Sequence, residues 1–163
     1  MAFTLELRSD SADLQFHCGL ALNAQGRAPE AAKAFKKTIE LDPNHAEAKE
    51  RLVEASYRSG DKEAARAMAE ALVANNTAGP VAHFYLGLMR MEGNQAELAI
   101  PDLEIAVQKM PGFPPPYQSL GEALLRAQKY PEKASWLLDQ AKTNAVALSQ
   151  DLQARLTEFS QKK

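Results

Sequence analysis

The residue types that most often carry out chemistry are sparse in this chain. Three histidines, His17, His45 and His83, and a single cysteine, Cys18, could in principle hold a metal ion or supply a nucleophile. The histidines show no metal-ligand spacing among themselves or with Cys18, and no glycine-rich phosphate loop, nucleophile elbow or zinc motif occurs. Cys18 falls on the predicted core side of a helix, where a small buried thiol is inert. The sequence therefore predicts no catalytic, metal or cofactor site.

Composition and charge limit the classes of function that the chain can have. A chain of 163 residues with 45% hydrophobic content is long enough for one domain with a packed core. Lys and Arg total 19 against 21 Asp and Glu, so the chain lacks the excess of basic residues that is typical of proteins that bind nucleic acid. No membrane span and no secretory signal are expected. The single cysteine cannot form an internal disulfide, and we expect a cytoplasmic protein. A mature or truncated form of a longer or exported protein is the alternative.

The elements that organise the chain recur every 34 residues. Gly19 returns as Gly87 and Gly121, and the alanine at 31 returns at 65 and 99. The stretch from Gly19 onward predicts a helix, a turn at Gly26, a second helix opening near Pro29, and a stop after residue 42. A fixed period in this range is the signature of stacked structural repeats.

This pattern resembles the tetratricopeptide repeat family. The resemblance covers residues 12 to about 147 and implies an all-α, right-handed α-solenoid of about four helix-turn-helix repeats. Leu152, Leu156 and Phe159 share one face of a final amphipathic helix, which we expect to cap the last repeat. The predicted division is an N-terminal extension at 1–11, repeats at 12–45, 46–79, 80–113 and 114–147, and a capping helix with tail at 148–163.

Some positions in the first repeat and at the N-terminus carry further expectations. Ser11 or Asp10 can cap the first helix, and its inward stripe is predicted from residues at helical spacing, namely Leu14, Cys18, Ala21 and Leu22. Within residues 1–11, Phe3, Leu5 and Leu7 alternate with polar residues. That segment is either a frayed terminus or a strand-like segment that docks in a groove of its own or of a neighbouring copy.

The later repeats depart from the pattern. Gly93 follows Gly87 by six residues, whereas Gly26 follows Gly19 by seven, which predicts an alteration of one residue in the third repeat.

Other departures concern prolines and packing positions. Pro101 lies inside an expected helix, so the helix either begins late or is kinked, and we favour a kink. Pro114 to Pro116 are expected to be extended, with Pro116 opening the next helix. Gln128 stands where a glycine would turn. Lys49 and His83 replace large apolar packing residues, and Lys133 replaces an alanine.

The resemblance implies a function in binding. Proteins of this family usually hold peptides or other proteins in a concave groove lined by the first helices of the repeats, and catalyse nothing. At about 100° per residue, the positions three before, one after and four after the packing glycine share one stripe of each first helix. The candidate groove residues are therefore Phe16, Leu20, Asn23, Glu50, Glu54, Tyr57, Phe84, Leu88, Met91, Gln118, Glu122 and Leu125.

Among the apolar residues of this stripe, we expect Phe16, Leu20, Phe84, Leu88 and Met91 to be exposed as anchors for a partner. The alternative is that tight curvature, or the alteration in the third repeat, buries some of them.

The charges of the stripe predict the kind of partner. Some family members clamp a partner's terminal carboxylates with a lysine and an asparagine, but those slots hold Phe16 and Leu20 here. The stripe contains no Lys or Arg and three glutamates, so an apolar segment with basic flanks, such as an amphipathic helix, fits better. We expect a protein–protein interaction module: an adaptor, co-chaperone or assembly factor. The alternative is a self-assembling structural scaffold that oligomerises through its terminal segments.

Overall fold

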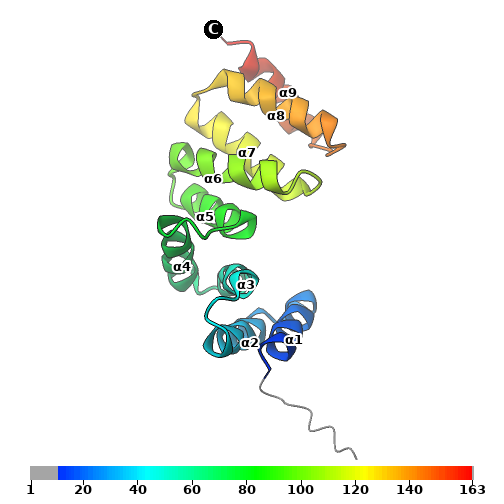
Figure 1. Ribbon diagram of the computed structural model, residues 1–163. Coiled ribbons are helices and arrows are strands. Elements are labelled where there is room, and N and C mark those ends of the chain that lie inside the picture. Colours follow the sequence, from blue (N-terminus) through cyan, green and yellow to red (C-terminus); the bar gives the residue numbers. More distant parts are fainter. Residues whose placement is uncertain (1–10, 163) are drawn as a thin grey trace, which may run out of the picture. The chain divides into compact units, whose positions relative to one another are not determined.

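The computed structural model describes residues 11–162, and every regular element in this part of the chain is an α-helix (Figure 1). The all-α prediction is therefore confirmed. The helices are α1 (Ala12–Ala24), α2 (Ala28–Leu41), α3 (Ala46–Arg58), α4 (Lys62–Ala74), α5 (Pro80–Glu92), α6 (Ala96–Lys109), α7 (Pro114–Ala127), α8 (Pro131–Thr143) and α9 (Gln150–Ser160). None of these helices is long and apolar enough to cross a membrane.

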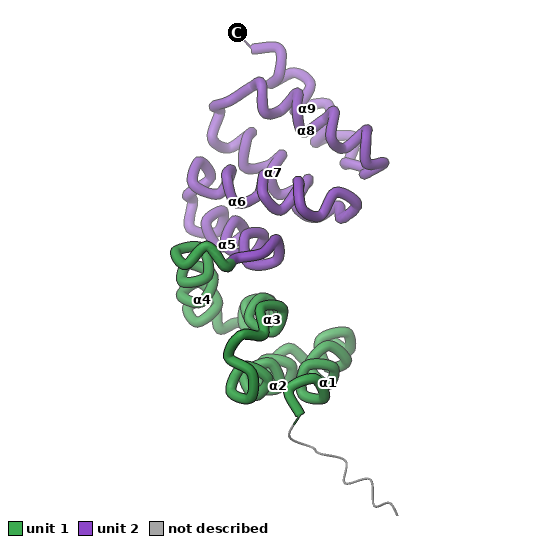
Figure 2. Tube along the Cα trace, in the orientation of Figure 1, with its two compact units in different colours: residues 1–77 green, residues 78–163 purple. Residues whose placement is uncertain are grey.

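The chain divides into two compact units (Figure 2). Unit 1 comprises residues 1–77 and contains α1 to α4, and unit 2 comprises residues 78–163 and contains α5 to α9. Each predicted repeat range contains two consecutive helices. The division into four repeats stays a prediction. The predicted docking segment, apart from Ser11, lies outside the described residues.

The helix starts follow from capping chemistry and from proline. Of the two predicted caps for α1, Ser11 is the residue at the N-cap, and its hydroxyl accepts a hydrogen bond of 3.1 Å from the Leu14 amide. Pro80, Pro114 and Pro131 are the first residues of α5, α7 and α8, where the missing N–H leaves no hydrogen bond unmade. The expectation that Pro114 to Pro116 are extended is wrong: they form the first turn of α7, because their restricted φ already suits a helix.

The turns keep the 34-residue period even where glycine is absent. Gly26 and Gly60 have positive φ angles of 76° and 91°, and Asn94 and Gln128 have positive φ angles of 56° and 50° at the corresponding positions. Gly93, with φ of −79°, is only the C-cap of α5. The predicted one-residue alteration in the third repeat is therefore wrong, because Asn94 takes the left-handed conformation that glycine takes earlier in the chain.

In each unit, two paired helices pack closely against each other at a glycine of the first helix. A Cβ atom on Gly19 would lie 2.5 Å from a ring carbon of Phe35, and one on Gly87 would lie 2.6 Å from Leu103 Cγ. These distances leave no room for a side chain, so α1 packs on α2 and α5 packs on α6 at these glycines. A Cβ on Gly121 would meet Leu156 of α9 at 3.1 Å.

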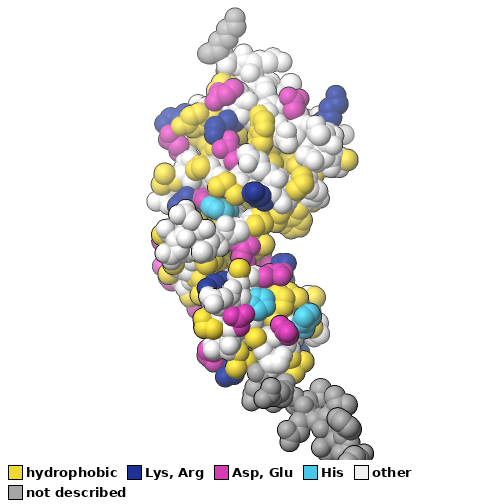
Figure 3. Space-filling model, viewed as in Figure 1, with side chains coloured by type: hydrophobic (Ala, Val, Ile, Leu, Met, Phe, Trp, Pro, Cys, Tyr) yellow, Lys and Arg dark blue, Asp and Glu magenta, His cyan; other side chains and the backbone are white. Residues whose placement is uncertain are grey.

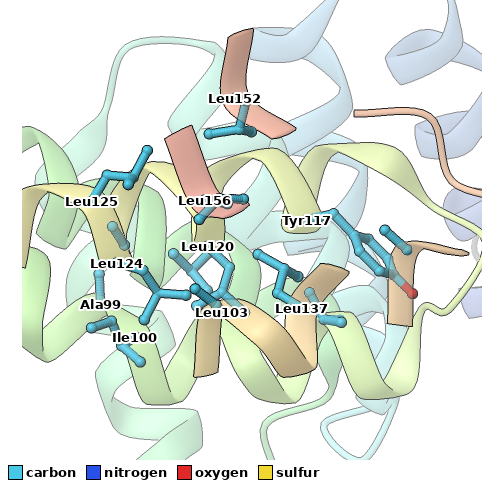
Figure 4. Close-up of a cluster of buried hydrophobic side chains, with 14 of the residues drawn as sticks. Ala99, Ile100, Leu103, Tyr117, Leu120, Leu124, Leu125, Leu137, Leu152 and Leu156 are labelled. Atoms are coloured by element: carbon cyan, nitrogen blue, oxygen red, sulfur yellow. The ribbon is translucent and has the colours of Figure 1, made fainter. Parts of the chain in front are cut away.

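The core of unit 2 continues through α9 (Figure 4). Leu103 of α6, Leu137 of α8 and Leu156 of α9 are fully buried around Leu120 of α7. Tyr117 is also fully buried, and its hydroxyl donates a hydrogen bond of 2.8 Å to the Pro111 carbonyl. As the sequence predicts, α9 buries its apolar face against the rest of unit 2.

The inward stripe predicted for α1 is wrong. Leu14 is 45% exposed, and Cys18 and Ala21 are also exposed, whereas Phe16, Gly19 and Asn23 are buried. Leu22 is half-buried. The physical reason is that Gly19 faces Phe35 of α2, so the buried residues of α1 flank Gly19 and the opposite stripe points away from α2. Cys18 is therefore not the buried thiol that the sequence predicts.

Helix α6 runs through Pro101 from Ala96 to Lys109, so the alternative of a late start near Pro101 is wrong. The kink stays a prediction. The residue after the proline, Asp102, is buried and binds two side chains of α5: His83 Nδ1 lies 2.8 Å from Asp102 Oδ1, and Arg90 donates to Asp102 Oδ2. A polar cluster thus replaces apolar packing at His83.

A first prediction concerns the turn at Gln128. A residue with a Cβ pays about 1 kcal/mol in the left-handed conformation, so Gln128→Gly is expected to raise the free energy of unfolding by about that amount in urea denaturation. Gln25, the C-cap of α1 with φ of −80°, is the control: Gln25→Gly should give no gain. An equal change at both positions would contradict the left-handed assignment.

A second prediction concerns the helix pairing. Gly87→Leu forces a side chain into Leu103 and is expected to lower the free energy of unfolding by about 3 kcal/mol. A Cβ on Gly112 would meet nothing within 4 Å, so Gly112→Leu is the matched control and should change stability little. A Gly87→Leu variant as stable as this control would show that α5 and α6 do not meet there.

Candidate functional site

The candidate residues of unit 1 lie on α1 and α3, and the aromatic one on α1 is buried. Phe16 is 7% exposed, and its ring centroid lies 4.5 Å from that of His45, the N-cap of α3, and 5.9 Å from that of Phe35. Leu20 is half-buried against the same core. The apolar residues predicted for the groove in unit 1 therefore join α1 to its neighbours in the core of this unit.

The polar candidates of unit 1 are engaged within the unit. Arg58 Nη1 donates to Asn23 Oδ1 at 2.9 Å and lies 3.5 Å from Glu54. Arg51 Nη1 donates to Glu54 at 3.1 Å. Burial acts to lower the pKa of Arg51, but its hydrogen bonds to Glu54 and then Glu47 outweigh burial and raise that pKa above its ordinary value. The charge of Glu54 is thus already compensated by two arginines of the same helix.

The two other candidates of unit 1 are partly or wholly covered. Glu50 is 9% exposed. Tyr57 is half-buried, and the Lys62 ammonium lies 5.2 Å from the centroid of its ring. Unit 1 consequently offers little of the acidic surface that the sequence predicts for a basic flank.

In unit 2 the candidates come from α5 and α7, which meet in one hydrophobic core. Phe84 and Met91 are each 7% exposed and Leu125 is 9% exposed, and all three belong to the same cluster. Leu88 is half-buried beside them. Gln118 is exposed. The first helices of unit 2 therefore bring their candidate residues together, but mostly as core.

The predicted exposure of Phe16, Phe84 and Met91 is wrong, and Leu125 is buried as well. For the two phenylalanines, the reason is an aromatic contact with the N-cap residue of a following helix, α3 or α7. Phe16 contacts His45 before α3, and Phe84 contacts Phe113 before α7, with ring centroids 6.3 Å apart. These residues were expected to be either exposed or buried, and the structure shows them buried. The one-residue alteration predicted for the third repeat is not the cause, because it does not occur.

Phe113 is an accessible aromatic residue that the sequence pattern did not identify. It is 46% exposed, and its ring meets that of Phe84 edge to face. It lies in the run Pro111–Pro116, between the end of α6 and the start of α7, so neither helix can bury it. That position, an aromatic residue between two helix breakers, is the signal that could have identified it.

We define the α5–α7 face as Leu88, Phe113, Gln118 and Glu122, of which Leu88 is half-buried and the others are exposed; the ring of Phe84 contacts that of Phe113. The side chain of Glu122 is 47% exposed, and its ion pair with Arg126 Nη2 is long at 4.0 Å. Figure 3 shows hydrophobic side chains reaching the surface of unit 2 among scattered charged ones. The face therefore combines an apolar part with an accessible carboxylate.

Among the described residues, no group of three or more His, Cys, Asp or Glu side chains could hold a metal ion. His83 and Arg90 of α5 both bind the carboxylate of Asp102 on α6. The charged groups of this cluster are therefore paired with one another. The cluster connects the two helices through polar contacts.

A third prediction follows from the burial of Phe84. Phe84→Ala should lower the free energy of unfolding by about 3 kcal/mol or more, because it leaves a cavity in the core of unit 2. Phe113→Ala, which removes a half-exposed ring, should cost less than about 1 kcal/mol in the same urea titration. If both variants lost equally little, Phe84 would be a surface residue, as the sequence alone suggests.

Comparison with known proteins supports the resemblance to a repeat family. Residues 22–83 match a family model described as tetratricopeptide repeat, and no curated protein matches the chain. A solved MamA protein is 26% identical, with 85% of this chain and 79% of that chain covered and a TM-score of 0.66. TTC0263, a thermophilic protein with this repeat from Thermus thermophilus, is 21% identical, with 91% and 81% covered and a TM-score of 0.65.

A third solved structure is YrrB, described as a protein of this repeat type with an unusual peptide-binding site; it is 18% identical, with 93% and 70% covered and a TM-score of 0.62. At this identity the likeness concerns the fold alone. Proteins with this fold are generally non-enzymatic modules for protein–protein interaction, and the family and fold support that general role here. The period of 34 residues, the paired helices and the matched family model lead to one conclusion: residues 22–83 match the tetratricopeptide repeat, and the described chain has the helical fold of the solved proteins of this repeat type.

Proposed function

We propose that this protein is an adaptor or assembly factor that holds a peptide or helix of a partner protein on the α5–α7 face of unit 2. The observation that carries the proposal is Phe113, which is 46% exposed while its ring rests against the buried ring of Phe84. An exposed aromatic side chain held by a second aromatic ring loses little entropy when a partner packs on it, and aromatic residues are frequent binding hot spots.

The chemistry of the α5–α7 face favours one kind of partner. Leu88 and Phe113 offer an apolar area for an aromatic or long aliphatic anchor. Glu122 is accessible and only loosely paired with Arg126, so it can accept a Lys or Arg side chain that flanks the anchor. An amphipathic helix with one basic flank carries both features along one side. Glu54 of unit 1 is a weaker partner for a basic residue, because arginines of its own helix already bind it.

The family supports a peptide ligand without identifying it. The peptide-binding site described for YrrB belongs to that protein, and it indicates that this fold can present such a site. A role as co-chaperone remains within the same proposal. The free thiol of Cys18 fits the reducing cytoplasm in which we place the protein.

A fourth prediction tests the α5–α7 face directly. Peptides are selected on the full chain from a random display library, and the affinity of one selected peptide is measured by fluorescence anisotropy. Phe113→Glu is expected to weaken binding about tenfold or more, because it places a carboxylate where the apolar anchor packs. Glu122→Lys should weaken binding severalfold for peptides with a basic flank, and should have little effect on those without one.

The matched control for Phe113 is Leu98, which is 55% exposed on α6. Leu98→Glu adds the same charge to a different helix and should leave the affinity unchanged. Circular dichroism of each variant checks that helicity is retained. Equal losses for Phe113→Glu and Leu98→Glu, or no loss for either, would contradict binding on this face.

A further inference from the structure

A pocket of about 350 Å³ lies between the last two helices of unit 2. Helices α8 and α9 lie side by side (Figure 1), and residues of both helices and of the connection between them line the pocket. We call it the α8–α9 pocket. It shares no residue with the α5–α7 face. Its volume falls in the range of about 300–1,000 Å³ that is usual for sites that bind small molecules.

The apolar part of the α8–α9 pocket depends on how α8 ends. Ala145 has a positive φ of 53°, and the Val146 amide donates a hydrogen bond of 2.8 Å to the Ala141 carbonyl. This left-handed turn folds the chain back onto the last turn of α8, and both Val146 and Ala141 are buried. Leu138 and Leu148, which are half-buried, complete the apolar lining. The pocket can therefore take an apolar side chain.

The polar lining on α8 contains one carboxylate and one ammonium. Asp139 and Lys142 are both exposed and both line the pocket. Neither side chain forms an ion pair or a hydrogen bond with another described residue. Residues three apart on a helix are neighbours on its surface. The pocket thus presents a negative and a positive group close together, each available to a ligand.

Helix α9 adds groups that can hydrogen-bond in both directions. The Thr157 hydroxyl donates a hydrogen bond of 2.8 Å to the Gln153 carbonyl of its own helix, which leaves the hydroxyl oxygen able to accept one. The side-chain amide of Gln153, which is exposed, can donate and accept. Sites for small ligands typically combine an apolar lining with a few polar groups that fix the orientation of the ligand.

We propose that the α8–α9 pocket binds a free α-amino acid with an apolar side chain. Such a ligand carries an ammonium and a carboxylate on the same carbon, so the ammonium can face Asp139 while the carboxylate faces Lys142. Hydrogen bonds between charged groups of this kind are stronger than those between neutral groups. The side chain of the ligand packs on Leu138, Val146 and Leu148. The proposal does not depend on peptide binding at the α5–α7 face.

The two charges favour a free amino acid over the end of a peptide chain. The C-terminal residue of a peptide carries a carboxylate for Lys142 but no ammonium for Asp139. The N-terminal residue carries the ammonium but no carboxylate. A free amino acid pairs both groups of the pocket, and blocked amino acids reproduce the two peptide ends in an experiment.

The fifth prediction uses L-leucine as the probe, titrated into the full, isotopically labelled chain. We expect saturable amide NMR shifts around Ala141, Val146 and Gln153, with a Kd of about 1 mM or below, a range open to a ligand of few atoms. N-acetyl-L-leucine, which lacks the ammonium, and L-leucinamide, which lacks the carboxylate, should each bind about tenfold more weakly. Glycine, which lacks the apolar side chain, should also bind about tenfold more weakly.

Two substitutions test the role of each charge. Asp139→Asn should weaken leucine binding about tenfold and leave the affinity for N-acetyl-L-leucine unchanged, because that analogue lacks the group that Asp139 binds. Lys142→Gln should likewise weaken leucine binding and leave the affinity for L-leucinamide unchanged. The matched controls are Glu132→Gln on α8 and Lys109→Gln on α6, which change exposed charges outside the pocket and should alter neither affinity.

Three results would overturn the proposal. One is the absence of saturable shifts with L-leucine. Another is equal binding of L-leucine and one of its blocked analogues, which would identify the end of a peptide chain as the ligand. The third is an effect of Asp139→Asn or Lys142→Gln on leucine binding no larger than that of its matched control.

Discussion

The contact on which the rest of this structure depends is the approach of paired helices at glycine. No Cβ fits between Gly19 and Phe35 or between Gly87 and Leu103, so the rotation of α1 and α5 about their axes is determined by the second helix of each pair. That rotation decides which residues are buried with Phe16 and Phe84, and which stripe of α1 faces away from α2. The candidate binding surface and the exposed stripe of α1 are therefore both consequences of the same close packing.

The candidate interaction surface is smaller and more specific than a groove lined by every first helix. Within each unit, an aromatic residue of one first helix contacts the N-cap residue of the next: Phe16 contacts His45, and Phe84 contacts Phe113. The parts of such a pair that a partner can contact are the more exposed ring and the polar residues beside it. In unit 2 the outer ring is Phe113, with Glu122 available on α7. In unit 1 the carboxylate of Glu54 is held by arginines.

Much of the fold could be predicted from the sequence because helix pairing depends on local, periodic signals. The recurrence of Gly19 and Ala31 and the position of the prolines predict the helices and their pairing. The left-handed turns at Asn94 and Gln128 could not be predicted from glycine alone, because the repeat imposes this conformation on other residues too. The burial of Phe84 and the exposure of Leu14 could not be predicted either, because both depend on contacts between helices that helical periodicity does not specify.

Binding of a peptide on the α5–α7 face can be tested residue by residue in an amide NMR titration of the full, isotopically labelled chain with a selected peptide. If a peptide binds on this face, chemical-shift changes are expected on α5, on α7 and on the turn that contains Phe113, around Leu88 and Glu122. Changes confined to the second helices α2, α4 and α6, or scattered without a common surface, would contradict binding on this face.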